Sequence, residues 1–154
     1  MSNGRNETEE ERLDRKWGDL LQELRVMQTG AQLTAGFLLT LPFTTKFPSL
    51  DDFQTGLYLV LVVVAALTTA TVITPVAVHR RISGQHVKER LVETAHRLVG
   101  IGLCLLAVLV TGIVVLIFDV VVDRTVAFVV GAAVAAILAG LLVALPLKLV
   151  GPHD

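Results

Sequence analysis

Residues 56–78 read GLYLVLVVVAALTTATVITPVAV and contain no charged side chain. Two further uncharged runs follow at residues 98–118 and 126–147. Because an α-helix rises about 1.5 Å per residue, each run is long enough to cross the roughly 30 Å hydrocarbon core of a bilayer. A fourth run, residues 26–43, is shorter and more polar. The pattern predicts an all-α protein built as a bundle of four transmembrane helices.

Composition supports a membrane protein. The chain has 154 residues, of which 53% are hydrophobic and 18% are charged, and the charges lie between the apolar runs. A water-soluble domain would need a more polar surface, so that class is excluded. The formal net charge of −1 indicates no nucleic-acid partner. The first predicted partner is therefore the lipid bilayer, and we expect Cys104, the single cysteine, to pack as a small hydrophobe.

Lys and Arg residues fall unevenly on the two sides of a four-span arrangement. One side receives the N-terminal segment, the connection 79–97 and the C-terminus. It holds every Lys and Arg of the chain except Lys46 and Arg124. Positively charged loops stay in the cytoplasm, so both termini are expected there, in a multi-pass protein of the cell membrane.

The chain divides into four predicted parts, which are a disordered N-terminus (1–7), an amphipathic interfacial helix (8–25), a four-span membrane domain (26–147) and a cytoplasmic tail (148–154). The interfacial helix opens with a capping-box pattern at Thr8 and Glu11, and Trp17 suits headgroup depth. After Ser83-Gly84, a second polar helix over residues 85–97 is expected to continue into the third span.

The first span carries a stripe of polar side chains close to one helical face. Its members are Arg25, Gln28, Thr29, Gln32 and Thr40. A buried amide without a partner in hydrocarbon costs several kcal/mol. The stripe therefore either lines a path for an ion or small solute, or makes hydrogen bonds between helices, for example to the threonines of residues 68–74.

Titratable residues gather where the spans meet the cytoplasm. This cytoplasmic rim consists of Glu23, His79, Arg80, Glu93, His96 and Arg97. Two histidines can ligate haem inside a four-helix bundle, but such ligands normally lie within the spans, so we expect an interfacial role. Anionic lipid headgroups are a second candidate partner of this rim.

No catalytic signature is found in the sequence. It contains no phosphate-binding glycine loop, no metal-spaced Cys/His set and no nucleophile–base arrangement, so we predict no catalytic residue, no metal, no cofactor and no enzymatic activity. No carboxylate falls in the middle of a span, which argues against proton-coupled transport. Small residues at 132, 136 and 140 recur every fourth position and permit close approach of a neighbouring helix.

Several stretches carry a family resemblance: ELRV at 23–26, GFLLTLPF at 36–43, PVAVHR at 75–80, KERLV at 88–92 and the pair His96-Arg97. Over about residues 12–122 the chain resembles a family of small actinobacterial membrane proteins catalogued as a domain of unknown function. Members are sometimes labelled sodium:proton antiporters. The resemblance implies a four-span protein whose cytoplasmic rim holds Glu23, Arg25, His79, Arg80, His96 and Arg97.

Two functions remain open at this point. The first is a non-enzymatic interaction or regulatory membrane protein that forms a homo-oligomer or joins another membrane protein. The alternative is an oligomeric channel or transporter subunit, in which the polar stripe of the first span lines the pathway. We predict the first.

Overall fold

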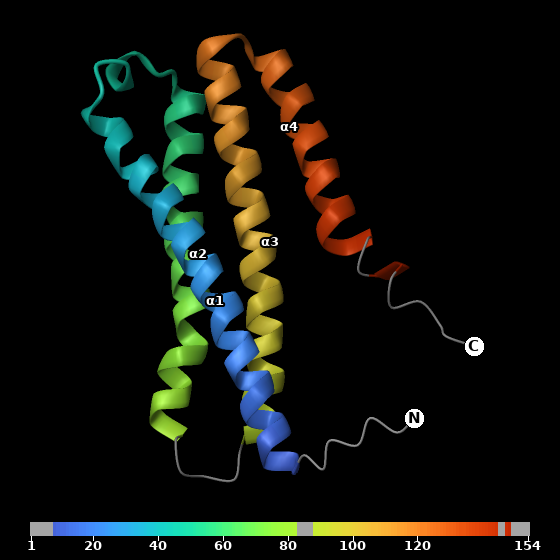
Figure 1. Cartoon of the computed structure of the whole chain (residues 1–154). Helices are drawn as coiled ribbons and strands as arrows, with labels where there is room; N and C mark the ends of the chain where they lie inside the picture. Colours follow the sequence, from blue (N-terminus) through green and yellow to red (C-terminus); the bar gives the residue numbers. More distant parts are fainter. Residues whose placement is uncertain (1–7, 83–87, 145–146, 149–154) are drawn as a thin grey trace.

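The computed structural model describes residues 8–82, 88–144 and 147–148. Four helices make up most of this part, namely α1 (Glu9–Thr40), α2 (Asp52–Ile82), α3 (Lys88–Val121) and α4 (Arg124–Ala139) (Figure 1). The connection between α1 and α2 contains two 3-10 turns, Leu41–Phe43 and Phe47–Ser49, and α4 ends in a π-helical turn, Gly140–Ala144. The described residues include no strand, which confirms the all-α prediction.

The first helix is longer than the sequence indicated. Its capping box is confirmed, because the Glu11 N–H donates to Thr8 Oγ1 at 3.3 Å and the Thr8 N–H donates to the Glu11 carboxylate at 2.9 Å. The bond from the Thr8 backbone lowers the pKa of Glu11. From there α1 runs without a break to Thr40, where Pro42 helps to end it in a 3-10 turn. The amphipathic segment and the first apolar run therefore form one helix.

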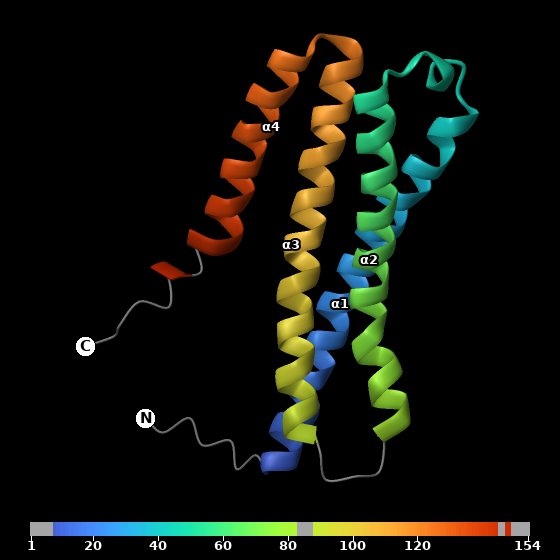
Figure 2. The same cartoon turned by 180° about the vertical axis from the view of Figure 1, so that it is seen from behind.

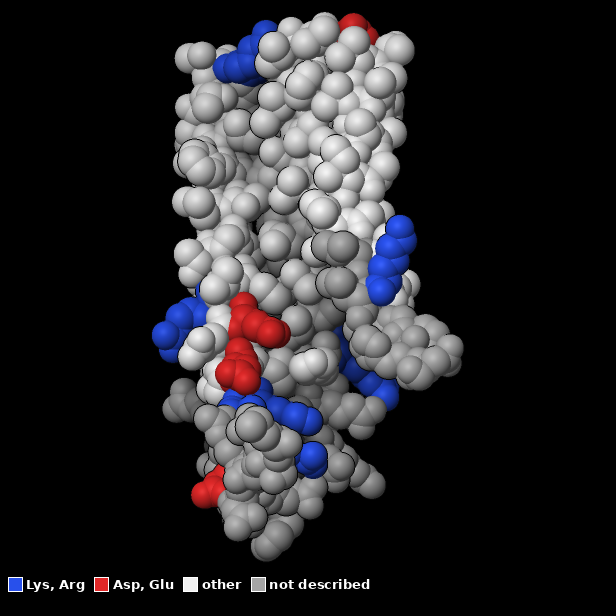
Figure 3. Space-filling model, turned by 45° about the vertical axis from the view of Figure 1, so that its right-hand side comes forward, with Lys and Arg blue, Asp and Glu red and all other residues white. Residues whose placement is uncertain are grey.

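Three helical segments are long and apolar enough to cross a membrane: Asp52–Val78, Thr94–Val121 and Arg124–Ala144. Among the described residues, α1 is amphipathic and contains no segment that is both long and apolar enough to be a fourth one. The predicted continuation of the polar helix into the third apolar run is confirmed from Lys88 onward, because α3 is unbroken. On the face seen in Figure 3, charged side chains lie at the upper end and from about the middle of the molecule downward, and an uncharged band separates the two groups.

The helices pack around α3. It contacts the other three helices, whereas α4 packs mainly along α3 and leans away from it toward its own C-terminal end (Figures 1 and 2). α1 crosses obliquely over α2 and α3. We call the end where α1 begins and α2 finishes the N-terminal end of the bundle. The opposite end, which holds the α3–α4 turn, is the Arg124 end.

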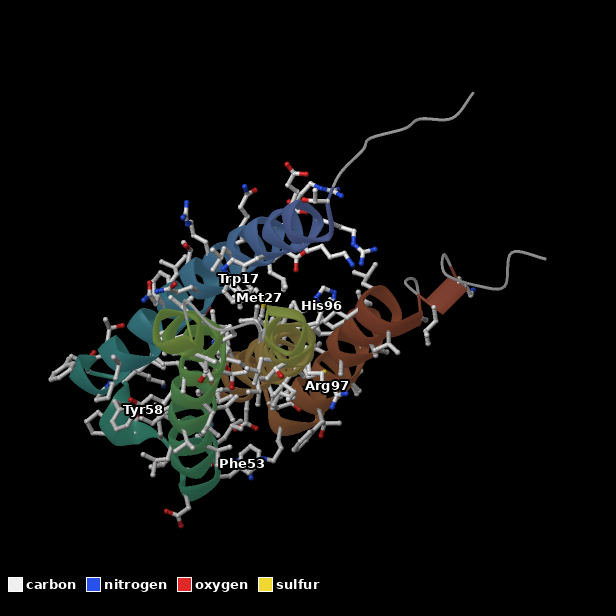
Figure 4. The ribbon with its side chains drawn as sticks, turned by 90° about the horizontal axis from the view of Figure 1, so that it is seen from below. Trp17, Met27, Phe53, Tyr58, His96 and Arg97 are labelled. Atoms are coloured by element: carbon white, nitrogen blue, oxygen red, sulfur yellow. The ribbon has the colours of Figure 1, made fainter. Side chains whose placement is uncertain are left out.

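One face of α1 supplies its share of the core. Buried residues recur there at spacings of three, four and seven, namely Leu20, Leu24, Met27, Ala31 and Leu38. Seen along the bundle, Trp17 and Met27 project from α1 toward the other helices (Figure 4). Leu24 and Met27 pack with Val72 near the N-terminal end, and Leu38 packs with Tyr58, Leu61, Ala65, Leu109 and Leu116 farther along.

Three glycines set the distances between helices. A Cβ atom on any of them would lie less than 3.0 Å from a side chain of the facing helix, with Gly102 against Met27, Gly112 against Leu61 and Gly131 against Val115. In a bilayer the lipid is as apolar as the helix surface, so helices associate through close packing at such small residues. The three glycines therefore bring α1, α2 and α4 close to α3.

We predict that Gly112→Leu destabilises the bundle, because the new side chain would overlap Leu61, which is only 2% exposed. Overpacking of this kind lowers the free energy of unfolding by about 1–3 kcal/mol. Thermal unfolding in detergent micelles measures it. The matched control is Gly100→Leu on the same helix, where no atom lies within 4 Å of the new Cβ. Equal melting temperatures for the two variants would contradict this account of α3.

Candidate functional site

The polar stripe of α1 lies on the side of the helix that faces away from α2 and α3. Arg25, Thr29, Gln32 and Thr40 are exposed, and Gln28 is half-buried. The buried residues Met27, Ala31 and Leu38 lie on the opposite side. The helix therefore presents a polar surface outward along most of its length.

The hydroxyls of the stripe are bonded within α1 itself. Thr29 Oγ1 donates to the Arg25 carbonyl at 3.0 Å, and Thr40 Oγ1 donates to the Phe37 carbonyl at 2.7 Å. In the part of the chain that the structure describes, the amides of Gln28 and Gln32 have no hydrogen-bond partner. The threonines of α2 also bond within their own helix, each to the carbonyl four residues earlier: Thr68, Thr69, Thr71 and Thr74. No hydrogen bond between described residues joins the stripe to them.

Gln32 lies near the middle of the bundle's apolar band. Ala35, one turn later on α1, packs against the core cluster that contains Ala65. Ala65 is at the midpoint of the apolar segment Asp52–Val78. Three helical residues span only about 4.5 Å, so the Gln32 amide is at the depth expected for the interior of a bilayer.

Two apolar grooves flank the second half of α1. One, of about 520 Å³, lies between α1 and α2 and includes Leu38, Ala65 and Ala70. The other, of about 440 Å³, lies between α1 and α3 and includes Phe37 and Ile113. The hydroxyls that line them are already donated to backbone carbonyls of their own helices: Thr69, Thr74, Thr34 and Thr40. Neither groove is a polar path for an ion.

Part of the rim is described. Glu23 on α1 is exposed, as are His96 and Arg97, which lie on different sides of α3 (Figure 4). The side chains of His79, Arg80 and Glu93 lie outside the described residues, as do Ser83-Gly84, the N-terminus 1–7 and the tail from 149 onward. Among the described residues, no group of three or more His, Cys, Asp or Glu side chains is placed to hold a metal ion.

Four small residues with a predicted packing role, three on α4 and one on α3, are not packed within the bundle. The α4 residues Ala132, Ala136 and Gly140 are exposed, and α4 packs on α3 through Ala127 and Gly131 instead. Cys104 is exposed on α3 and does not pack inside the bundle.

A set of polar contacts between different helices lies at the Arg124 end and was not predicted from the sequence. We call it the Arg124 cluster, and it consists of Asp51, Gln54, Asp119 and Arg124. Arg124 Nε donates to Asp119 Oδ1 at 3.0 Å, and its NH2 group donates to Asp51 Oδ2 at 2.5 Å. Gln54 Nε2 donates to Asp119 Oδ2 at 2.8 Å. The Asp119 side chain is 2% exposed, so this carboxylate is buried and fully paired.

Gln54 and Asp51 also start α2. The Gln54 N–H donates to Asp51 Oδ1 at 2.8 Å, and the Asp51 N–H donates to Gln54 Oε1 at 3.1 Å. This reciprocal pair is a capping box, and Asp123 caps α4 by accepting from two backbone N–H groups. Asp51 and Gln54 therefore both cap α2 and belong to the Arg124 cluster. Asp123, which caps α4, is the sequence neighbour of Arg124.

Aromatic rings extend the Arg124 cluster. The Arg124 guanidinium lies 4.3 Å from the centroid of the Phe53 ring, and Phe53 contacts Phe128 of α4 at 5.9 Å between centroids. A cation over an aromatic face is attracted by the ring quadrupole. Through these contacts the α1–α2 connection, α2, α3 and α4 meet at one point.

The contribution of Asp51 to the stability of the Arg124 cluster depends on pH. The bond from the Gln54 backbone, assisted by Arg124, holds the pKa of Asp51 below its usual value. A carboxyl whose pKa is lowered by folding stabilises the fold above its unfolded-state pKa. That contribution disappears as the pH falls through the lowered value.

The sequence did contain a signal for this cluster. Asp51 and Gln54 have the spacing of a capping box, and Arg124 is one of two cations expected on a side that also holds four aspartates. What no local pattern could supply is the contact between residues 51 and 124, because it depends on how the α1–α2 connection folds over the end of α3.

We predict that Arg124→Gln lowers the melting temperature by several degrees, because it leaves the buried Asp119 carboxylate without its cation. Lys46→Gln is the matched control, since Lys46 is exposed at the same end and has no ion pair among the described residues. Thermal unfolding at neutral pH measures both variants. A melting temperature unchanged by Arg124→Gln would show that the cluster does not hold the fold.

Comparison with known proteins places the chain in a family. No curated protein and no solved structure matches it. A family model described as a family of unknown function, DUF6328, matches residues 6–146, which is most of the chain. The protein therefore belongs to the DUF6328 family.

Proposed function

We propose that this protein is a non-enzymatic, four-span membrane protein that self-associates through the outward polar face of α1, with both termini in the cytoplasm. The topology is supported by the bundle itself, because α1 begins, α2 finishes and α3 begins at one end. That end also carries most of the Lys and Arg residues, as expected of the cytoplasmic side.

A single observation carries the proposal of self-association. Gln32 presents an unpartnered amide outward at the depth of the bilayer interior. Leaving such a group in contact with hydrocarbon is unfavourable by several kcal/mol. A neighbouring protein surface that offers a donor and an acceptor removes this cost, whereas lipid chains offer neither.

The disposition of acidic groups supports a role without proton exchange. Within the three apolar segments the acidic residues are Asp52 and Asp119, which both lie at segment ends, and Asp119 is occupied by Arg124 and Gln54. Proton-coupled carriers place titratable groups inside the membrane on the transport path. An antiporter activity therefore has no support from these residues.

We expect energy transfer between donor- and acceptor-labelled copies in liposomes to rise with protein density, as it does for a reversible homo-oligomer. Gln32→Leu should weaken association about three- to tenfold, since an interhelical hydrogen bond in a membrane contributes roughly 0.6–1.4 kcal/mol.

Thr74→Val is the control for this experiment, because its hydroxyl is exposed on α2 and already donated to Ala70. Energy transfer no greater than random proximity at every density would overturn the proposal of self-association.

The alternative function is an oligomeric channel or transporter subunit. It is favoured by the same outward stripe together with the apolar character of both grooves, because a polar pathway would then form only where several copies bring their α1 faces together. Arg25 would form a ring of charge at the cytoplasmic mouth of such a pathway.

Flux measurements separate the two functions. A channel predicts that protein reconstituted in liposomes conducts at least one member of a panel of monovalent ions and small neutral solutes, and that Gln32→Leu changes the rate. Association in the same vesicles without any flux would leave the interaction role and remove the channel.

A further inference from the structure

The outward face of α1 has the spacing of a helix–helix interface. Starting at Gly18, residues alternately four and three positions apart follow one line along the helix: Gly18, Gln22, Arg25, Thr29, Gln32, Gly36 and Leu39. We call this line the outer seam. All of its members are exposed except Gly18, which is half-buried. On the opposite side of α1, residues with the same spacing are buried and pack against α2 and α3. The helix thus has two such lines, and only the buried one is packed within the protomer.

Glycines of the outer seam have no explanation within the protomer. A Cβ atom added to Gly18 or to Gly36 would have no atom of another helix within 4 Å. Glycine weakens a helix interior relative to alanine, so it usually occurs where another backbone must come close. Gly102, Gly112 and Gly131 have such a neighbour within the protomer. A second helix lying on the outer seam would supply it for Gly36.

The chemistry of the seam selects a second copy of this chain as the occupant. The Gln32 amide is both a donor and an acceptor, so two Gln32 side chains satisfy each other. Copies inserted with the same topology run parallel, and each residue then meets its counterpart at the same depth. An unrelated apolar helix would leave both amides unsatisfied.

We propose that the outer seam packs against the outer seam of a second copy, in a parallel dimer about a two-fold axis along the membrane normal. Gly36 lies at the closest approach, and the two Gln32 amides bond to each other one turn away. A seam with an average spacing of 3.5 residues gives a left-handed crossing. This inference rests on the self-association proposed above and names its surface and its partner.

Arg25 sets where the two helices cross. In a parallel pair the two Arg25 side chains carry like charges at one end of the contact, where their stems can extend to the headgroup region. Repulsion there favours a crossing point nearer Gly36. The N-terminal parts of the two helices are then farther apart than the parts around Gly36.

Cysteine cross-linking in membranes tests the seam. In a Cys104→Ser background, Gly36→Cys should form oxidised dimers in high yield, because each cysteine meets its counterpart across the axis. Gln32→Cys should do so as well at a protein density high enough to offset the loss of the amide pair. The control is Val108→Cys, which lies on α3 near the middle of its apolar segment and is 57% exposed. It should form dimers at least tenfold more slowly. The chain without any substitution is a second control, because its only cysteine, Cys104, is also exposed on α3.

A pair of glycine substitutions provides the second measurement. Gly36→Leu should weaken association by at least about tenfold, because the leucine separates the backbones and prevents the Gln32 pair from forming. Gly100→Leu should leave association unchanged. Both glycines have open space around them in the protomer, so neither leucine should lower the melting temperature of the protomer.

The outcomes distinguish this inference from the proposal on which it rests. Energy transfer that persists while cross-links form at Val108 or Cys104, and not at Gln32 or Gly36, would retain self-association but overturn the outer seam and the α1 face as its surface. Association that tolerates Gly36→Leu would overturn it as well. A chain that is monomeric at all densities would overturn both.

Discussion

The interior of a bilayer offers no hydrogen-bond partner, and the placement of the polar groups of this chain follows from that constraint. The threonines of α2 satisfy it locally, since each hydroxyl donates to a carbonyl of its own helix. A hydroxyl can do this because its side chain is short. The amide of Gln32 has a longer side chain with two donors, and it lies outward without a partner in the described part of the chain. This amide, which cannot be satisfied within its own helix turn as a hydroxyl can, is the group on which the proposed self-association rests.

Ionised groups meet the same constraint at the Arg124 end. Asp119 is the buried carboxylate of the described core, and Arg124 and Gln54 occupy both of its oxygens. α4 packs mainly on α3. The bond from Arg124 to Asp51 and the contact between Phe128 and Phe53 join α4 to the start of α2. The leaning of α4 toward its free end agrees with an attachment concentrated at one end.

Features that depend on neighbours in sequence were predictable. The apolar runs, the Thr8–Glu11 cap and the end of α1 before Pro42 each depend on residues within a few positions. The Arg124 cluster was not predictable, because it joins residues that are 73 positions apart. The polar stripe of α1 was visible, but periodicity alone cannot say whether it faces inward. Likewise the small residues at 132, 136 and 140 suggested a packing face, while Ala127 and Gly131 form it.

The continuity of α1 has a mechanical consequence. Its 32 residues make a rod about 48 Å long, which exceeds the hydrocarbon thickness by more than a third. No proline or bulge interrupts it, so no joint separates the part that begins at Thr8 from the part that carries Gln32. Any force applied to the first turns is transmitted as tilt or rotation to the far end, beside Pro42. The close contact of α1 with α3, where Met27 faces Gly102, lies between the two ends of this rod.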